Sequence, residues 1–504
     1  MTAGNALQQD RDAEFQEFLR PFEIAPKKIK LYSDTVEIMS PDKINCSPRT
    51  ETQFPGWKKL CIREYILWSL FVILLIFSTA TVVSSAEIPF RHIFNQWQLM
   101  LFFLSLFISA IYLAFLGVSA SFSPAWPDVY SDSDLPEVTV LVPAYNEGEH
   151  VFYTLRSLLD SNYPADKLHI IAVNDGSLDN TLHYLQMAGK LSGQISVIDL
   201  KKNMGKKHAL YQGMMRASGD IIITVDSDSI VHHDALRKIV QPFADQRTGA
   251  VAGMLCSKPG KYNFHVRMMD VALIFGCAFL RKAQSSCGNV FCTPGALSAY
   301  RKSAVLPIAD EWLSQKFMKQ PASIGEDRAI ATLLLRNGFH IVHQPAARAE
   351  TCLPETYSGV CKMLLRWTRS DIRENLLMSP FVIKQLREPT VKSFNLFIHW
   401  LALSINMLLP FISLPAVICG LFVHNHTGYQ LAAIYISSAL WSIVPAWIYW
   451  REKRFFRQTI WAFLFGFYSL FMLSWITVYS VFTVRDSRWL SREIKSGKKQ
   501  IPNR

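Results

Sequence analysis

The chain has 504 residues, of which 50% are hydrophobic, and a formal net charge of +12. This length allows more than one domain. None of the nine cysteines forms a C-x-x-C pair, which excludes the usual zinc-binding motifs and favours reduced thiols in a cytoplasmic domain. The positive charge is better explained by basic residues that flank membrane segments and meet anionic lipid headgroups than by nucleic-acid binding.

Residues 1–60 are polar with scattered charge, and we predict a flexible segment. Because the first apolar run starts only after them, we expect no cleavable signal peptide. The following apolar runs each provide the roughly 20 residues that a bilayer requires, and they lie at 65–85, 97–117, 395–423, 429–450 and 459–484. So many runs are not typical of core helices in a soluble protein, and we predict an integral membrane protein.

The apolar runs divide the chain into an expected series of domains. These are two transmembrane helices in 61–118, an α/β domain in 119–360, amphipathic interface helices in 361–394, transmembrane helices in 395–484 and a basic tail in 485–504. Lys58, Lys59 and Arg63 precede the first run, and basic residues favour the cytoplasmic side. We therefore expect a multi-pass protein of the plasma (inner) membrane with a cytoplasmic central domain. Three crossings in 395–484 would place the basic tail outside, so we expect one run to re-enter or to cross an even number of times.

The central domain alternates strand-like and helix-like patterns. Apolar strands end in polar turns in EVTVLVPAYNEGEH (137–150), HIIAVNDGSLDNT (169–181) and GDIIITVDSDS (219–229). This alternation predicts an α/β fold with a mostly parallel sheet and helices on both faces, and ligands of such sheets gather at the carboxyl ends of the strands. Each polar residue there is singly more typical of a turn or cap, but their repeated placement favours a binding site that includes Asn146, Glu147, Asp175, Asp226 and Asp228.

The two aspartates of VDSDS are spaced i, i+2, so both side chains point to one side if the strand continues through them. Two close carboxylates repel each other unless a cation lies between them. Oxygen ligands suit Mg²⁺ or Mn²⁺, and Mg²⁺ is usually completed by substrate phosphates. Asp226 and Asp228 therefore predict a site for a metal–diphosphate. The basic pair Lys206 and Lys207 in NMGKK either adds charge to the same phosphates or forms a solvated turn.

Two further motifs lie later in the chain. In SIGEDRA (323–329), Glu326 and Asp327 precede a helical pattern, where a carboxylate either caps the helix or acts as a general base. In KMLLRWTRSDIREN (362–375), Arg366 suits bidentate phosphate binding, and Trp367 offers a flat face to a sugar ring. The alternative for this segment is an interfacial membrane helix anchored by Trp and Arg, and the two roles are compatible.

The chain resembles membrane-bound processive family 2 glycosyltransferases over residues 60–495. The motifs that carry the resemblance, in order, are PAYNE, NDGS, NMGKKHA, VDSDS, GNVFCTPGALSAYR, GED and RWTRS. The similarity is greatest to the hyaluronan synthases and chitin-oligosaccharide synthases, and it also extends to the synthases of cellulose and poly-N-acetylglucosamine. It implies a GT-A-like fold, a UDP-sugar donor, Mg²⁺ or Mn²⁺ as cofactor and hexosyltransferase activity.

The resemblance also implies a role for each donor-side residue. Tyr145, Glu147 and Asp175 would hold the uridine. Lys206 would lie near the diphosphate, and Asp226 would contact the nucleotide.

The remaining roles concern the metal and the acceptor. Asp228 would bind the metal, and Asp327 would be the general base that deprotonates the acceptor hydroxyl. Arg366 would stabilise the UDP leaving group, and Trp367 would stack on the acceptor sugar.

Three positions depart from the motifs of the family. Met363 occupies the first place of Q-x-x-R-W, which removes a polar contact near the acceptor. Pro294 and Gly295 form a turn more similar to that of the poly-N-acetylglucosamine enzymes, and Asn174 stands where many relatives have the first Asp of a D-D-G motif. The reaction class survives these changes, whereas the sugar identity stays open.

We expect a processive, inverting β-glycosyltransferase that polymerises sugar from UDP-GlcNAc, with or without UDP-GlcA, and extrudes the chain across the membrane. The expected partners are the UDP-sugar donor, the growing polysaccharide and membrane lipids, without nucleic acid. One alternative is transfer of a single sugar to a lipid carrier or glycolipid. Another is a transporter with a regulatory cytoplasmic domain, which the uncharged apolar runs disfavour.

Overall fold

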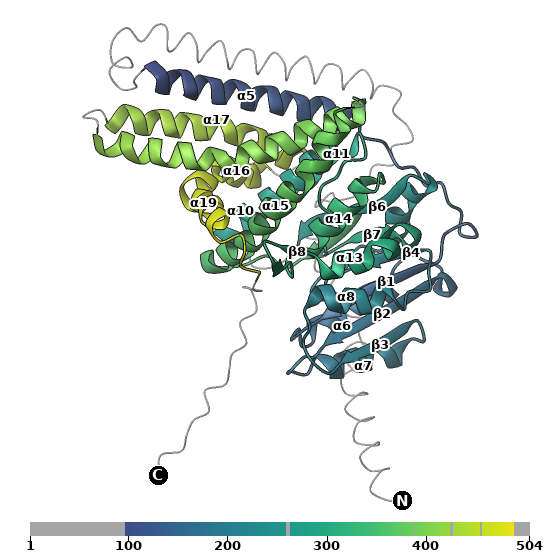
Figure 1. The fold of residues 1–504 in the computed structure, drawn as a ribbon. Helices are drawn as coiled ribbons and strands as arrows, with labels where there is room; N and C mark the ends of the chain where they lie inside the picture. Colours follow the sequence, from purple (N-terminus) through teal and green to yellow (C-terminus); the bar gives the residue numbers. More distant parts are fainter. Residues whose placement is uncertain (1–95, 259–262, 388, 424–426, 454–455, 488–504) are drawn as a thin grey trace, which may run out of the picture.

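The computed structural model describes residues 96–258, 263–387, 389–423, 427–453 and 456–487. The polar segment 1–60, the apolar run 65–85 and most of the basic tail lie outside these ranges. The described chain forms an α/β domain and a layer of long helices beside it (Figure 1).

The α/β domain is built on an eight-stranded sheet with the order β3-β2-β1-β4-β7-β6-β10-β5. Neighbours within β3-β2-β1-β4 are parallel, as are β6 and β10, while β7 and β5 run antiparallel to their neighbours. The strands are β1 (Val138–Ala144), β2 (Leu168–Asp175), β3 (Ile195–Leu200), β4 (Ile221–Thr224), β5 (Ile230–Val231), β6 (Thr248–Ser257), β7 (Ser298–Arg301) and β10 (His340–Thr351). A separate hairpin consists of β8 (Lys316–Phe317) and β9 (Gln320–Pro321).

Helices cover both faces of the sheet, which is why its central strands are apolar throughout. All seven residues of β1 are buried, as expected for strands covered on both sides. On one face of the sheet, Val140 belongs to the same hydrophobic cluster as residues of α6 (His150–Leu159), α7 (Thr181–Leu191), α9 (Ala235–Val240) and α10 (Phe264–Ile274). On the other face, Leu141 belongs to the same hydrophobic cluster as residues of α8 (Lys206–Met214), α12 (Lys302–Val305), α13 (Ala309–Ser314), α14 (Glu326–Arg336) and part of α15 (Tyr357–Gln385). The predicted mostly parallel sheet with helices on both faces is confirmed.

Short helical segments complete the α/β domain. They are the 3₁₀ turns η4 (Ala165–Lys167), η5 (Gln241–Ala244) and η7 (Leu306–Ile308), the π-helical η6 (Phe275–Arg281) and the following α11 (Lys282–Ser285).

Long helices coincide with the apolar runs that fall within the described ranges. They are α5 (Gln96–Ser121), α16 (Val391–Val423), α17 (Thr427–Lys453), and the continuous series α18 (Phe456–Tyr468), η8 (Ser469–Leu473) and α19 (Ser474–Phe482). Of the described residues, one helical stretch, Thr459–Phe482, combines the length and mean hydropathy of a membrane span. Passage of the other helices through a membrane remains a prediction.

The series from α18 to α19 begins and ends against the α/β domain. Near its start, the ring of Trp461 lies 5.1 Å from the guanidinium of Arg267 in α10. At its end, Arg369 of α15 donates to the hydroxyl of Thr483 at 2.9 Å. The carbonyl of Ser487 then accepts from the Ser323 hydroxyl at 2.8 Å. The described end of the chain therefore lies beside the α/β domain.

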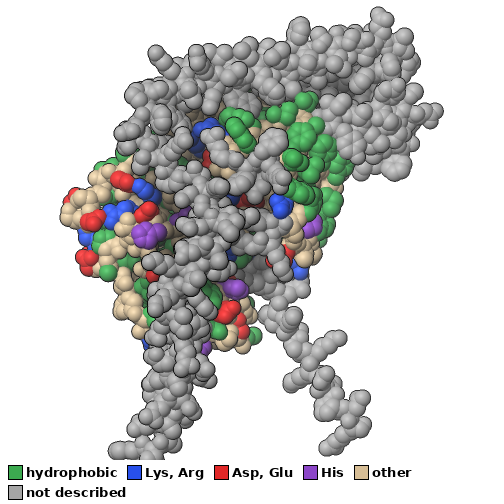
Figure 2. All heavy atoms as spheres, turned by 180° about the vertical axis from the view of Figure 1, so that it is seen from behind, with side chains coloured by type: hydrophobic (Ala, Val, Ile, Leu, Met, Phe, Trp, Pro, Cys, Tyr) green, Lys and Arg blue, Asp and Glu red, His purple; other side chains and the backbone are tan. Residues whose placement is uncertain are grey.

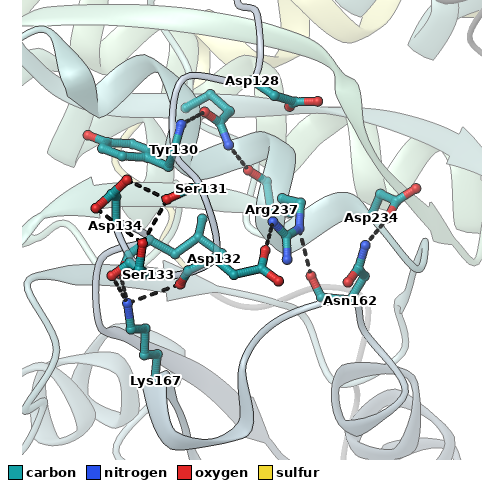
Figure 3. Close-up of polar contacts among 12 residues, drawn as sticks. Asp128, Tyr130, Ser131, Asp132, Ser133, Asp134, Asn162, Lys167, Asp234 and Arg237 are labelled. Atoms are coloured by element: carbon teal, nitrogen blue, oxygen red, sulfur yellow. Dashed lines mark hydrogen bonds and ion pairs between the residues drawn. The ribbon is translucent and has the colours of Figure 1, made fainter.

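The segment between α5 and β1 is tied to the α/β domain by ion pairs and backbone contacts (Figure 3). Asp128 pairs with Lys238, and Asp132 with Arg237, each at 2.6 Å. The ammonium of Lys167 donates to three carbonyl oxygens of the same segment. Exposed ion pairs contribute little singly, but these contacts together fix where α5 joins the domain.

The segment predicted to form interface helices is α15 and the start of α16. Leu376, Ile383 and Phe394 are large hydrophobic side chains exposed on it, and Lys384 and Arg387 lie in the same stretch. Figure 2 shows charged side chains interspersed over the α/β domain and hydrophobic ones gathered toward the helical layer. The exposed hydrophobic side chains beside basic residues on this segment support the predicted contact between 361–394 and lipid.

Candidate active site

The two predicted aspartates follow β4 at the carboxyl edge of the sheet. The strand ends at Thr224, and the N–H of Ser229 donates to the carbonyl of Asp226 at 3.1 Å, which closes a turn. The strand geometry therefore does not continue through Asp226 and Asp228. The directions of the Asp226 and Asp228 carboxylates are therefore set by this turn, and not by the alternation of side chains along a strand.

Lys206 connects the loop after β4 to the start of α14. It is the first residue of α8, and its Nζ lies 2.5 Å from Asp226 Oδ1 and 2.7 Å from Glu326 Oε1. Gly295 packs against this pair so closely that a Cβ there would come within 2.5 Å of Nζ. The Pro-Gly turn singled out in the sequence therefore lies directly against the predicted diphosphate lysine.

The charges of this ion-paired group support one another. Burial alone lowers the pKa of Lys206, but the carboxylates of Asp226 and Glu326 outweigh it and hold that pKa above its usual range. Burial raises the pKa of Glu326, and the ammonium of Lys206 brings it below its usual range. The lysine is thus a cation and Glu326 a carboxylate at neutral pH.

Asp175 ends β2 and accepts from the turn that starts α8. Its two oxygens accept from the backbone N–H groups of Met204 at 2.8 Å and Gly205 at 2.9 Å. Burial raises the pKa of Asp175, and these two hydrogen bonds reduce the shift. Gly205 has a φ of +93°, a conformation that favours glycine. Asp175 therefore positions Lys206 through the backbone.

The predicted uridine residues Tyr145 and Glu147 follow the end of β1. Tyr145 is half-buried. The N–H of Glu147 donates to the Thr181 hydroxyl at 2.8 Å, and its Oε1 accepts from Ser227 at 2.8 Å. Because Ser227 lies between the two aspartates, Glu147 fixes the turn that carries them. The loops after β1, β2 and β4 thus meet at one edge.

The predicted general base, Asp327, lies in the first turn of α14 next to Glu326. Its Oδ1 accepts from the N–H of Arg328 at 2.8 Å, and its Oδ2 accepts from the thiol of Cys292 at 3.5 Å. Burial, followed by the negative charge of Glu326, raises the pKa of Asp327 to about 6, while Lys206 acts in the opposite direction. A carboxylate with this pKa suits proton transfer near neutral pH.

The loop before Asp327 is held by buried side chains that donate to its carbonyl oxygens. The three pairs are Lys207 with Ala322 at 3.0 Å, Trp312 with Glu326 at 2.9 Å, and Arg373 with Ile324. Burial lowers the pKa of Lys207 to about 8. The two lysines of NMGKK therefore have different roles. Lys206 pairs with carboxylates, and Lys207 donates to a carbonyl of the loop before Asp327.

Arg366 and Trp367 are on α15, which packs against this loop. Arg366 lies near enough to Glu326 for its charge to lower the pKa of that carboxylate. Trp367 is 39% exposed, so its ring has an accessible surface. The predicted leaving-group residue Arg366 and the predicted acceptor residue Trp367 are therefore both on the helix that borders Glu326 and Asp327.

The structure accounts for two departures from the family motifs. Met363 is buried in a cluster with Met268, Met269 and Tyr468, so it packs α15 against α10 and α18. The amide of Asn174 donates to Asp199 at 2.7 Å, and its oxygen accepts from the N–H of Ser177 at 3.2 Å. An amide meets both requirements, whereas a carboxylate at position 174 would face a second carboxylate.

Asp226 and Asp228 offer oxygen ligands of the kind that a divalent cation takes. In the part of the chain that the structure describes, no three His, Cys, Asp or Glu side chains gather as a metal site. Asp226 and Asp228 would therefore supply few of the oxygens that Mg²⁺ or Mn²⁺ requires. Donor phosphates commonly supply the rest.

Sequence reasoning missed several residues that build this site. The sequence predicts Glu326 only as a cap or a base, whereas the structure pairs it with Lys206 across a long sequence separation. Cys292 and Arg373 lie within motifs but have no predicted role, and Trp312 lies outside every motif, because their contacts around Glu326 and Asp327 depend on tertiary packing. The adjacent acidic residues of GED and the adjacent lysines of NMGKK were the signal available for the Lys206–Glu326 pair.

Comparisons with known proteins show the family to which the chain is similar. Residues 139–306 match the family described as Glycosyl transferase family 2. An N-acetylglucosaminyltransferase of Rhizobium sp. (strain N33) is 30% identical over 391 residues, which cover 75% of this chain and 83% of the relative. A hyaluronan synthase of Streptococcus pyogenes is 27% identical over 367 residues, which cover 71% of this chain and 83% of that relative.

One solved structure with a similar chain is a mannosyltransferase from Pyrobaculum calidifontis in complex with GDP-Man and Mn²⁺. It is 18% identical with a TM-score of 0.48, and the similarity covers 72% of this chain and 97% of that one.

Proposed function

This chain belongs to glycosyl transferase family 2 and is a hexosyltransferase of the UDP-sugar type, close to the hyaluronan synthases and chitin-oligosaccharide synthases. From that premise, we propose that it is a processive, inverting β-glycosyltransferase that polymerises GlcNAc-containing or hyaluronan-like polysaccharide. Its donor is UDP-GlcNAc, joined by UDP-GlcA if the product is hyaluronan.

The observation that carries this proposal is the position of Lys206. One ammonium contacts Asp226 at the sheet edge and Glu326 beside Asp327. A cation placed between the predicted donor carboxylates and the predicted base suits a reaction in which a diphosphate leaves while a hydroxyl loses its proton.

In the proposed reaction, Asp327 accepts the proton of an acceptor hydroxyl. The oxygen of that hydroxyl forms a bond with the anomeric carbon of the donor sugar. The bond from this carbon to the phosphate oxygen breaks, and UDP leaves with the electron pair. Attack opposite the leaving group inverts the anomeric configuration, and Trp367 supports the acceptor ring during this step.

The charge that develops on UDP is balanced by residues on both sides of the site. Lys206 and Arg366 supply positive charge from α8 and α15. Asp228, with Asp226 beside it, would hold Mg²⁺ or Mn²⁺, which when bound offsets charge on the leaving diphosphate as a Lewis acid. Tyr145, Glu147 and Asp175 orient the uridine, with Glu147 and Asp175 also fixing the loops around it.

We place the protein in the plasma (inner) membrane, with the α/β domain in the cytoplasm. Agreement of α5, α16 and α17 with the apolar runs supports several crossings, and the exposed hydrophobic side chains of α15 support an interfacial position. Contacts at both ends of the α18–α19 series with the α/β domain favour this run as the one that re-enters. The tail then stays cytoplasmic, as its basic residues predict.

Product length distinguishes polymerisation from transfer of a single sugar to a lipid carrier. The purified full-length protein is incubated with each UDP-sugar singly and in pairs, with Mg²⁺ or Mn²⁺, and UDP release and product size are measured together. We expect a ladder or high polymer from UDP-GlcNAc alone for a chitin-like product, or from UDP-GlcNAc with UDP-GlcA for hyaluronan. A single lipid-linked sugar would reject processivity and leave the transferase intact.

A further inference from the structure

Glu326 contacts the predicted diphosphate lysine in addition to the predicted donor carboxylate, Asp226. Its side chain is 7% exposed, whereas that of Asp226 is 30% exposed. The end of the ion-paired group that faces Glu326 is therefore enclosed, and the end that faces Asp226 is more open. A diphosphate that approaches Lys206 from the donor side meets an ammonium already engaged by a buried carboxylate.

Glu326 is held in place by contacts that do not involve Lys206. Trp312, itself buried, donates to the carbonyl of Glu326 at 2.9 Å. The preceding Gly325 has a φ of +71°, and its Cα faces Ser370 of α15 so closely that a Cβ would lie 1.7 Å from the Ser370 hydroxyl. These contacts fix the backbone at Glu326, and its side chain, which is 7% exposed, leaves the carboxylate little room to move away from Lys206.

A fixed carboxylate reduces the attraction between Lys206 and any phosphate. An ammonium has three N–H donors, and Asp226 and Glu326 engage two of them. Their negative charges also repel a diphosphate over the short distances of a partly enclosed site. Part of the positive charge that would otherwise hold UDP is consequently neutralised before UDP arrives.

Resting on the proposed function, we infer that Glu326 is a positioning residue that limits how tightly Lys206 holds UDP and so speeds release of this product. The ammonium then stabilises the departing diphosphate during bond breaking without retaining it afterwards. A polymerising enzyme must release one UDP for each sugar added, so slow release would limit every cycle.

The test compares UDP affinity between the full-length protein and its Glu326→Gln variant by calorimetric titration with UDP in the presence of Mn²⁺. Loss of one nearby negative charge is expected to tighten UDP binding roughly fivefold at partial solvent screening. The KM for the donor and kcat should both fall, and UDP should inhibit more strongly. A merely structural role would instead weaken UDP binding.

Matched variants identify the route of the effect. Glu311→Gln removes an exposed carboxylate that pairs with Arg336 on the surface, and it should leave UDP affinity unchanged. In a Lys206→Met background, Glu326→Gln should change UDP affinity less than about twofold, because the ammonium through which Glu326 acts is absent. If a thermal melt shows that Glu326→Gln is not folded, Glu326→Ala removes the same charge and should give the same change in UDP affinity.

The outcomes separate this inference from the proposed function. Failure of the unmodified protein to bind UDP would contradict the proposed function itself. Binding of UDP by the unmodified protein, with equal or weaker binding by the folded Glu326 variants, would overturn the role of Glu326 alone.

Discussion

At the scale of single residues, Asn174 shows how one contact explains a departure from the family motif. Its amide bridges Asp199 and the backbone of Ser177, and it is buried. The ammonium of Lys201, followed by the amide of Asn174, holds the pKa of Asp199 below its usual range. The identity of residue 174 therefore depends on that of residue 199 on the neighbouring strand.

We expect Asn174→Asp to lower the free energy of unfolding at pH 7 by about 1 to 3 kcal/mol, because two carboxylates then face each other. Addition of Asp199→Asn should restore most of the loss, since an amide again meets a carboxylate. Thermal unfolding in detergent measures both effects. Equal melting temperatures for the single and double variants would show that the pair does not interact.

Asp327 provides a pH-dependent prediction. The pKa of its carboxyl is raised to about 6, and a general base acts in its ionised form. The value of kcat/KM for the donor should therefore rise as pH increases through about 6, and Asp327→Asn should lower kcat by about 10²- to 10⁴-fold. A profile that stays flat between pH 5 and pH 7 would remove Asp327 from the role of base.

At the scale of elements, the site depends on close packing between α15 and the loop that precedes α14. Gly325 combines a positive φ with direct contact to Ser370, whereas Gly338 has a φ of +82° and no atom near its Cβ position. Substitution of Gly338 would therefore add backbone strain alone, whereas substitution of Gly325 would add both backbone strain and steric overlap. The comparison tests whether the approach of α15 to Asp327 is as tight as the structure indicates.

Gly338→Ala should cost about 1 to 2 kcal/mol, the strain of a left-handed conformation. Gly325→Ala should cost at least about 1 kcal/mol more, because overlap with Ser370 is added, and it should also lower activity. Chemical denaturation measures the difference between the two variants. Equal losses would mean that α15 does not press against the loop, and partial recovery with Ser370→Gly is expected if it does.

The elements also show what sequence reasoning can reach. Apolar runs that end in polar turns predicted the strands before Glu147, Asp175 and Asp226, because a strand covered on both faces must be apolar and its end must turn. The same reasoning pointed Asp226 and Asp228 to one side only if the strand continued through them, and the backbone turns there instead. A period-two pattern describes side chains only while the strand lasts.

Contacts between distant parts of the chain could not be predicted from the sequence. Lys206 and Glu326 meet because α8 and α14 lie on the same face of the sheet, which follows from strand order. The strand order itself places β7 between β4 and β6, and no local pattern encodes this insertion. The same holds for Met363, whose burial against α10 depends on how α15 crosses the domain.

At the scale of the whole molecule, both ends of the α18–α19 series return to the α/β domain. The proposed topology therefore puts the C-terminus on the same side of the membrane as the active site. A protease-cleavable tag appended to the C-terminus should be cut in inside-out vesicles and protected in intact cells. Cleavage in intact cells would instead require this series to cross the membrane once.

The most direct test of the proposed chemistry is UDP release from UDP-GlcNAc by the purified full-length protein with Mn²⁺, compared between the unmodified chain and Asp228→Asn. If the carboxylates at the sheet edge bind the ion that carries the activated sugar, the unmodified chain releases UDP. The variant then loses this release while keeping its melting temperature. Unaltered release by Asp228→Asn would contradict the metal–diphosphate site on which the proposed mechanism rests.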